Sequence, residues 1–92
     1  MTYYLKDPHA RVDYAIDWLA FLGGQSVAAS EWEVVPVEEG GLVVEEERSE
    51  VNRTAALLGG GIPGHVYTVS NLVTLTDGCT DARSICLRVE ER

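Results

Sequence analysis

One stretch of the sequence decides the fold: His65-Val66-Tyr67-Thr68-Val69-Ser70-Asn71-Leu72-Val73-Thr74-Leu75. The odd-numbered positions from Tyr67 onward are mostly apolar, whereas Thr68, Ser70 and Thr74 occupy the alternate positions. A period of two is typical of a β-strand with one buried face. The stretch is therefore predicted to be a long strand with its odd-numbered side chains in the core.

The flanking segments predict a turn on one side and a hairpin on the other. Residues 59–64 hold four of the nine glycines together with Pro63, which favours a turn. Residues 76–81 contain Asp77-Gly78, a dipeptide typical of hairpin loops. Arg83 to Glu90 alternates again and is predicted to be the closing strand, with Ile85, Leu87 and Val89 inward.

The first half of the chain predicts two strands. Val12 to Trp18 alternates, with its apolar side chains on the even positions. A helix over Ala10 to Leu22 remains an alternative, because Pro at position 8 also suits a helix start. Val27 to Val37 is predicted to be a strand, and a bulge near Val27 would explain its odd spacing from Trp32. Val34 and Pro36 are expected to share the inner face with Trp32.

The acidic middle of the chain has a weaker pattern. Leu42 to Val44 is predicted to be a short strand, Glu45 to Ser49 an exposed segment, and Glu50 to Leu58 the next strand. Six or seven short strands separated by turns are typical of an all-β sandwich. Tyr67, which follows the glycine-rich turn, has the position of a tyrosine corner, whose hydroxyl bonds to the chain a few residues upstream.

Length and charge exclude several classes of protein. The 92 residues fit one domain, with 1–9 as an extended N-terminal arm and 10–92 as a single β-sandwich. Seven Lys and Arg against 15 Asp and Glu give a net charge of −8, which argues against nucleic acid and anionic membrane as partners. Much of the acidity lies between Glu31 and Glu50, so one edge of the sandwich should be acidic. The sequence shows no signal peptide or membrane-spanning stretch.

Candidate reactive residues form no catalytic or cofactor-binding pattern. His9 and His65 have no Cys or second His at the spacing of a zinc site. Cys79 and Cys86 lie too far apart along a strand for a disulfide with each other. They are either two thiols in a reducing compartment or partners for cysteines of a neighbouring chain. We therefore expect no enzyme activity, no cofactor and no metal.

Five segments, in order, resemble a family of small structural proteins of tailed bacteriophages. They are Lys6-Asp7-Pro8, Asp13 to Trp18, Ser30 to Val34, Gly64 to Asn71 and Thr80 to Val89. The family pattern at these places is Lys-Asp-Pro, Asp-Tyr-x-x-Asp-Trp, Ser-x-Trp-x-Val, Tyr-x-Val-x-Asn and Thr-Asp-x-Arg-Ser. The resemblance covers nearly the whole chain, but residues 38–49 are more acidic than usual.

The resemblance implies an immunoglobulin-like sandwich of about seven antiparallel strands in a virion. It further implies a non-enzymatic adaptor that joins tail or baseplate to tail fibers in multiple symmetric copies and is made in the cytoplasm of a bacterial host. Its partners would be the tail tube, the baseplate or a fiber, with no nucleic acid and no membrane. Capsid decoration, a head–tail neck protein and a carbohydrate- or cell-surface-binding module are the alternatives.

Three elements are expected to make the contacts with neighbouring proteins: the N-terminal arm, the glycine-rich turn and the hairpin loop. Apolar side chains in the arm would be costly to leave in water. The candidate contact residues are Tyr3, Tyr4, Leu5, Ile62, Pro63, Asp77 and Cys79.

Overall fold

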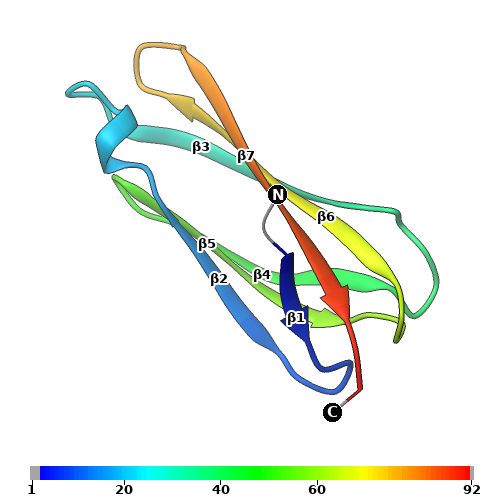
Figure 1. Cartoon of the computed structure of the whole chain (residues 1–92). Coiled ribbons are helices and arrows are strands. Elements are labelled where there is room, and N and C mark those ends of the chain that lie inside the picture. Colours follow the sequence, from blue (N-terminus) through cyan, green and yellow to red (C-terminus); the bar gives the residue numbers. More distant parts are fainter. Residues whose placement is uncertain (1–2, 92) are drawn as a thin grey trace.

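The computed structural model describes residues 3–91 as an elongated β-sandwich of 42 × 23 × 18 Å (Figure 1). Seven strands form two facing sheets, and one short 3-10 helix, η1, follows the second strand. Their bounds are β1 Tyr3–Lys6, β2 Val12–Asp17, η1 Leu19–Phe21, β3 Val27–Val35, β4 Leu42–Ser49, β5 Arg53–Gly60, β6 Val66–Leu75 and β7 Thr80–Val89. The prediction of an all-β sandwich is confirmed.

The strand order is that of an immunoglobulin-like sandwich. One sheet has the order β1-β7-β6-β3 and the other β2-β5-β4, so the third, sixth and seventh strands share a sheet as they do in immunoglobulin domains. One pairing departs from the expected antiparallel arrangement. β1 runs parallel to β7, with Tyr3 beside Cys86 and Lys6 beside Val89. Period-two patterns do not reveal strand direction, so the parallel pairing could not be predicted from them.

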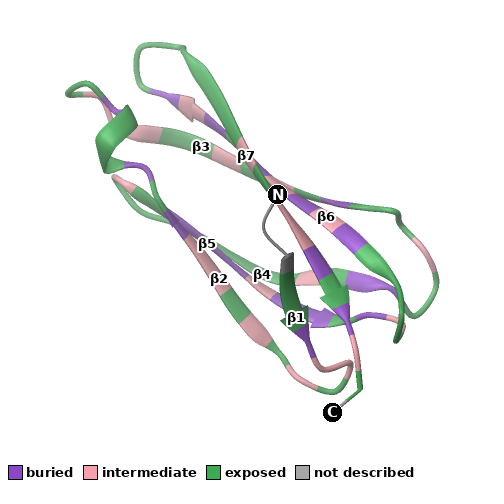
Figure 2. Ribbon diagram, viewed as in Figure 1, coloured by how far each residue is buried: buried purple, intermediate pink, exposed green. Residues whose placement is uncertain are grey.

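The core lies between the sheets, where the inner face of β6 is buried along its whole length (Figure 2). Its odd-numbered residues, from Tyr67 to Leu75, are all buried, as the alternation predicted. Leu87 and Val89 of β7 and Leu58 of β5 pack against one part of this face. Ile16, Trp18 and Leu22 pack against the other part.

The residues of β2 form a strand and not the alternative helix. Each residue from Val12 to Asp17 pairs with β5, and Ile16 and Trp18 are buried. The backbone then turns through η1, an element that the sequence did not predict. Three residues are too few for a helical period to be visible.

The predicted bulge in β3 is confirmed, because its register against β6 shifts between Val27 and Ala29. Trp32 is half-buried and Val34 is buried on the inner face, as expected. Pro36 is not on that face: β3 ends at Val35, a cis peptide bond follows, and Pro36 is exposed.

The acidic middle differs most from prediction. β4 extends from Leu42 to Ser49, well beyond the expected Val44, with a register shift between Val44 and Glu46. β5 begins at Arg53 and ends at Gly60, two to three residues later than expected. β4 is an edge strand, and residues 45–49 are all exposed. They therefore show no alternation that could have revealed a strand.

Three polar side chains are buried together in the core. The indole Nε1–H of Trp18 donates to Thr54 Oγ1 at 3.0 Å and to Asn71 Oδ1 at 3.2 Å. The hydroxyl of Thr54 donates to the same Asn71 oxygen at 2.6 Å. Asn71 in turn donates to Ser30 Oγ at 2.8 Å and to the carbonyl of Glu31 at 3.0 Å. The cluster joins β5, β6 and β3 across the sandwich.

Candidate docking surfaces

The N-terminal segment is joined to the glycine-rich turn by a buried lysine. Lys6 is 2% exposed, and its Nζ donates to the carbonyl oxygen of Gly60 at 2.7 Å and to that of Asp7 at 2.9 Å. The backbone N–H of Glu90 also donates to the Lys6 carbonyl at 2.9 Å. Residues 3–6 of the predicted arm thus lie at the edge of the sheet, beside β7 (Figure 1), and residues 1–2 lie outside the described part of the chain.

Burial lowers the pKa of the Lys6 ammonium group, because the charged form loses its hydration. Asp7 and Glu45 oppose this change by favouring the positive charge. A buried lysine whose Nζ bonds to two carbonyl oxygens serves to position the chain. We assign Lys6 the role of holding β1 against the sandwich.

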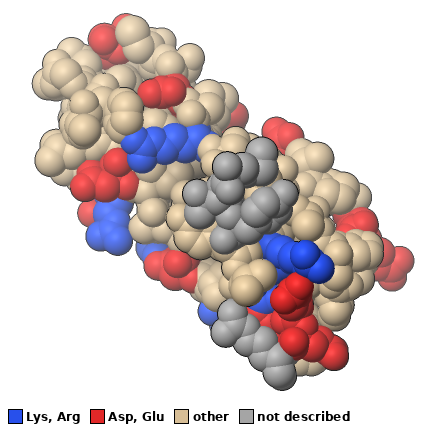
Figure 3. All heavy atoms as spheres, viewed as in Figure 1, with Lys and Arg blue, Asp and Glu red and all other residues tan. Residues whose placement is uncertain are grey.

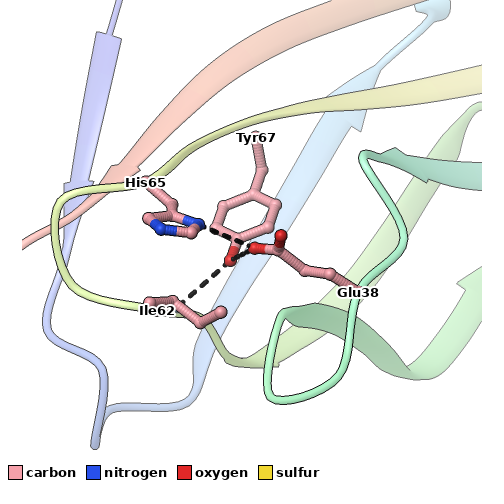
Figure 4. Close-up of polar contacts among 4 residues, drawn as sticks. All are labelled: Glu38, Ile62, His65 and Tyr67. Atoms are coloured by element: carbon pink, nitrogen blue, oxygen red, sulfur yellow. Dashed lines mark hydrogen bonds and ion pairs between the residues drawn. The ribbon is translucent and has the colours of Figure 1, made fainter.

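The glycine-rich turn and the loop between β3 and β4 meet at a tyrosine corner (Figure 4). The backbone N–H of Ile62 donates to the Tyr67 hydroxyl oxygen at 3.1 Å, which confirms the predicted bond to the chain upstream. The same hydroxyl donates to Glu38 Oε1 at 2.6 Å, and His65 Nδ1 lies 2.8 Å from that oxygen. Four residues from two loops and one strand are thereby fixed relative to each other.

The electrostatics of this corner follow from the shared carboxylate. Hydrogen bonds from Tyr67 and His65 lower the pKa of Glu38, because they stabilise its charged form. Burial raises the pKa of Tyr67, and the bond to Glu38 raises it further. The phenol therefore stays protonated and keeps its role as donor.

The end of the sandwich around this corner carries five of the expected contact residues. Tyr4 is 45% exposed and Leu5 53% exposed on β1, and Tyr3 is the first residue of that strand. Pro63 is exposed in the turn, and Ile62 is half-buried beside it. The bond from Lys6 to Gly60 brings the two segments together. We refer to β1 and residues 61–65 as the corner end.

Asp77 and Cys79 lie at the opposite end of the sandwich, because the ten-residue strand β6 separates their loop from the corner end (Figure 1). Both residues are exposed. A hydrogen bond with Asp77 raises the pKa of the Cys79 thiol, which reduces its reactive thiolate form. The loop is held in place by Thr76, whose hydroxyl donates to Gln25 Oε1 at 2.6 Å.

Sequence reasoning missed the most apolar surface at this second end. Leu19 is 61% exposed and Phe21 52% exposed in η1. The guanidinium of Arg83 lies 4.2 Å from the centre of the Phe21 ring and 5.0 Å from that of Trp18. Leu19 and Phe21, two large apolar residues shortly before Gly23-Gly24, are the sequence feature that could have predicted this surface. We refer to η1 and residues 76–79 as the loop end.

The predicted acidic edge lies along neighbouring strands of the two sheets. Glu31 and Glu33 are on β3, and Glu45 to Glu47 are on β4, which packs beside it. A surface depression of about 430 Å³ lies along this edge. In Figure 3 the acidic side chains extend over both ends of the visible face, and the basic ones lie among them.

Residues 3–91 contain neither a metal-holding group of side chains nor a membrane-spanning helix. No group of three or more His, Cys, Asp or Glu in that range is arranged to hold a metal ion. None of the helices in the described part of the chain is long and apolar enough to cross a membrane.

The chain matches the model of a known protein family. A family model described as podophage GP4 fiber-tail adaptor protein gp77 matches residues 6–88. That range begins at the buried Lys6 and includes every strand from β2 to β6 and nearly all of β7. No curated protein matches the chain.

Proposed function

The chain belongs to the podophage GP4 fiber-tail adaptor family, and from this premise we propose that it joins the tail or baseplate to tail fibers. Family membership supports a structural role in the phage tail. The adaptor acts by docking and carries out no chemical reaction. Its contacts are with other virion proteins, and it works in several symmetric copies, so that individually weak contacts add up.

One observation supports the proposal: exposed apolar side chains lie at both ends of the sandwich. An adaptor must hold two neighbours at once without either blocking the other. The corner end offers Tyr4, Leu5 and Pro63, and the loop end offers Leu19 and Phe21. The two ends lie along the long dimension of the sandwich, whose full extent is 42 Å. Exposed apolar side chains of this size are typical of protein interfaces.

The expected contact residues divide between the ends in the same way. Tyr3, Tyr4, Leu5, Ile62 and Pro63 would engage one neighbour, and Asp77 and Cys79 would engage the other, beside Leu19 and Phe21. The face between the ends stays available for packing of further copies. This arrangement suits a short spacer that holds the fiber at a fixed position relative to the tail.

Electron-microscopy reconstruction of the assembled particle tests the proposal. We expect density for this sandwich between the tail or baseplate and the fibers, with its long axis joining the two. Density on the capsid shell or at the head–tail neck would overturn the adaptor role, as would density at the outer tip of the fibers, where a carbohydrate-binding module would act.

Variants at each end sharpen that test. Leu5→Ser and Phe21→Ser each remove one exposed apolar side chain and should leave the fold intact. We expect each variant to weaken attachment to a different neighbour. The assembled particles would then lack either this protein or their fibers. Val43→Ser is the matched control, because Val43 is exposed on β4, outside both ends. Particles of normal composition from both end variants would contradict the two-ended arrangement.

A further inference from the structure

The edge of the larger sheet at β3 is open. β3 is last in the order β1-β7-β6-β3, so β6 is its one neighbour in that sheet within residues 3–91. In an antiparallel edge strand, every second residue directs its N–H and C=O away from the neighbouring strand. After the bulge, residues 29–35 are in regular register with β6. This length, about 23 Å at 3.3 Å per residue, suffices for one added strand.

The other open edges are less suitable. β1 has only four residues, and one of them, Tyr4, already packs against β2, with the rings of Tyr4 and Tyr14 5.9 Å apart. β4 contains a register shift between Val44 and Glu46, which interrupts a regular ladder. Sandwiches with the immunoglobulin topology also extend their sheet at the strand equivalent to β3. β2, the remaining edge strand, has six residues against nine in β3, so β3 offers the longer ladder for strand addition.

The surface beside β3 has room and an unused donor. The depression of about 430 Å³ is lined by residues 30–33 of β3, Glu47 of β4, and Ser70 and Leu72 of β6. The indole Nε1 of Trp32 is buried, with no acceptor among the described residues. A buried N–H without an acceptor destabilises the folded chain. A segment bound at this edge could supply an oxygen atom for it.

The charge along β3 restricts what can bind. Glu31 and Glu33 are exposed two residues apart, so they lie on the same face of the strand. Neither they nor Glu47 take part in an ion pair within the described part of the chain. A second copy of β3 in antiparallel register would bring glutamates opposite glutamates, which is destabilising. Lys or Arg at alternate positions would instead complement this edge.

We propose that β3 binds an extended, basic segment of a partner protein by strand addition, with its Lys or Arg side chains opposite Glu31 and Glu33. Backbone hydrogen bonds to β3 supply affinity, and the alternating charges fix register and direction. The inference rests on the proposed adaptor role and adds the chemistry of one partner to it. The site lies along the side of the sandwich, apart from both ends.

Photo-cross-linking in assembled particles tests this inference. Leu72 is replaced by p-benzoyl-phenylalanine, because Leu72 lines the depression, is uncharged and is 42% exposed. After irradiation, mass spectrometry identifies the cross-linked segment. We expect a segment of another virion protein with Lys or Arg at alternate positions. A cross-link to a second copy of this chain, or to a segment without that pattern, would overturn the inference. So would the absence of a cross-link from position 72 when the same group in place of Phe21 does form one.

Charge reversal supplies the matched comparison. Glu31→Lys with Glu33→Lys should reduce the cross-link from position 72 about tenfold or more, because like charges across an interface cost several kcal/mol. Glu39→Lys with Glu50→Lys makes the same change in net charge at exposed positions that do not line the depression and should leave the yield within about twofold. Equal yields from the two pairs would refute the inference. If the reversed pair does not fold, Glu31→Gln with Glu33→Gln takes its place, with a smaller expected loss.

The two proposals fail in different ways. If the chain lies between tail and fibers but position 72 contacts no basic segment, only the strand addition is refuted. If position 72 contacts a basic segment but the chain lies on the capsid or in the neck, only the adaptor role is refuted.

Discussion

The backbone N–H of Ile62 donates a hydrogen bond to the hydroxyl oxygen of Tyr67, 3.1 Å away and five residues along the chain. The bond joins the start of β6 to the turn that precedes it. The same hydroxyl reaches Glu38 in the loop after β3. One phenol thus determines how two loops of the corner end lie on the sandwich.

Replacing Tyr67 with Phe should destabilise the protein by about 1–3 kcal/mol, because the part-buried Ile62 N–H loses its acceptor. Urea unfolding measures the change. Tyr4→Phe is the control, since Tyr4 is exposed on β1 and its substitution should change stability by less than about 0.5 kcal/mol. Equal unfolding midpoints for Tyr67→Phe and the parent protein would contradict the role of the corner.

Stability should fall in acid partly through Glu38. Its pKa is lowered in the folded state, so its contribution is present above the unfolded pKa and is lost as pH falls from about 5 toward 3. Glu38→Gln removes the titrating group. We expect the urea midpoint of this variant to change less with pH over that range than that of the parent.

The control for this pH experiment is Glu39→Gln, an exposed neighbour in the same loop. It should keep the pH dependence of the parent protein. A Glu38→Gln variant with an unchanged pH dependence would show that the carboxylate does not stabilise the corner.

Lys6→Ala should destabilise the protein by about 2 kcal/mol or more. The change removes a buried aliphatic stem and leaves the Gly60 carbonyl without its donor. Lys6→Met keeps most of the stem and should cost less. Arg11→Ala is the control: its ion pair with Glu45 is exposed and should contribute less than about 1 kcal/mol. Similar losses from Lys6→Ala and Arg11→Ala would contradict a positioning role for Lys6.

Asn71→Ala should be among the most destabilising single changes, at about 3 kcal/mol. It removes the acceptor shared by Trp18 and Thr54 and the donor to β3. Thr54→Val should cost less, because the Trp18 N–H keeps its bond to Asn71. Ser70→Ala, beside Asn71 on the outer face, should be nearly neutral, and thermal unfolding of the three variants gives the order. A smaller loss for Asn71→Ala than for Thr54→Val would contradict the central place of Asn71.

The sequence predicted the strands whose two faces differ. β6, β2 and β7 each have one buried and one exposed face, so their alternation was visible, and the bulge in β3 followed from one odd spacing. The strand predicted for β4 ended too early, at Val44, because residues 45–49 are exposed on both faces. Edge strands of this kind carry no pattern that separates them from a loop.

The docking surfaces were only partly predictable. The glycine-rich turn and the hairpin loop were visible in composition, but η1 was not, since exposed Leu19 and Phe21 resemble core residues in a sequence. The burial of Lys6 depends on a carbonyl 54 residues away. The parallel pairing of β1 joins residues more than 80 positions apart. Local patterns hold no information on contacts of that range.

The parallel pairing of β1 with β7 has a mechanical consequence. Their register runs from Tyr3 beside Cys86 to Lys6 beside Val89. When two parallel strands are pulled along their axis from the start of one and the end of the other, the ladder is loaded in shear, and its hydrogen bonds must break together. Tension applied at Tyr3 and Val89 would load this ladder in that way. The small sandwich is thereby built to resist a pull along its strands far better than a peeling force across them.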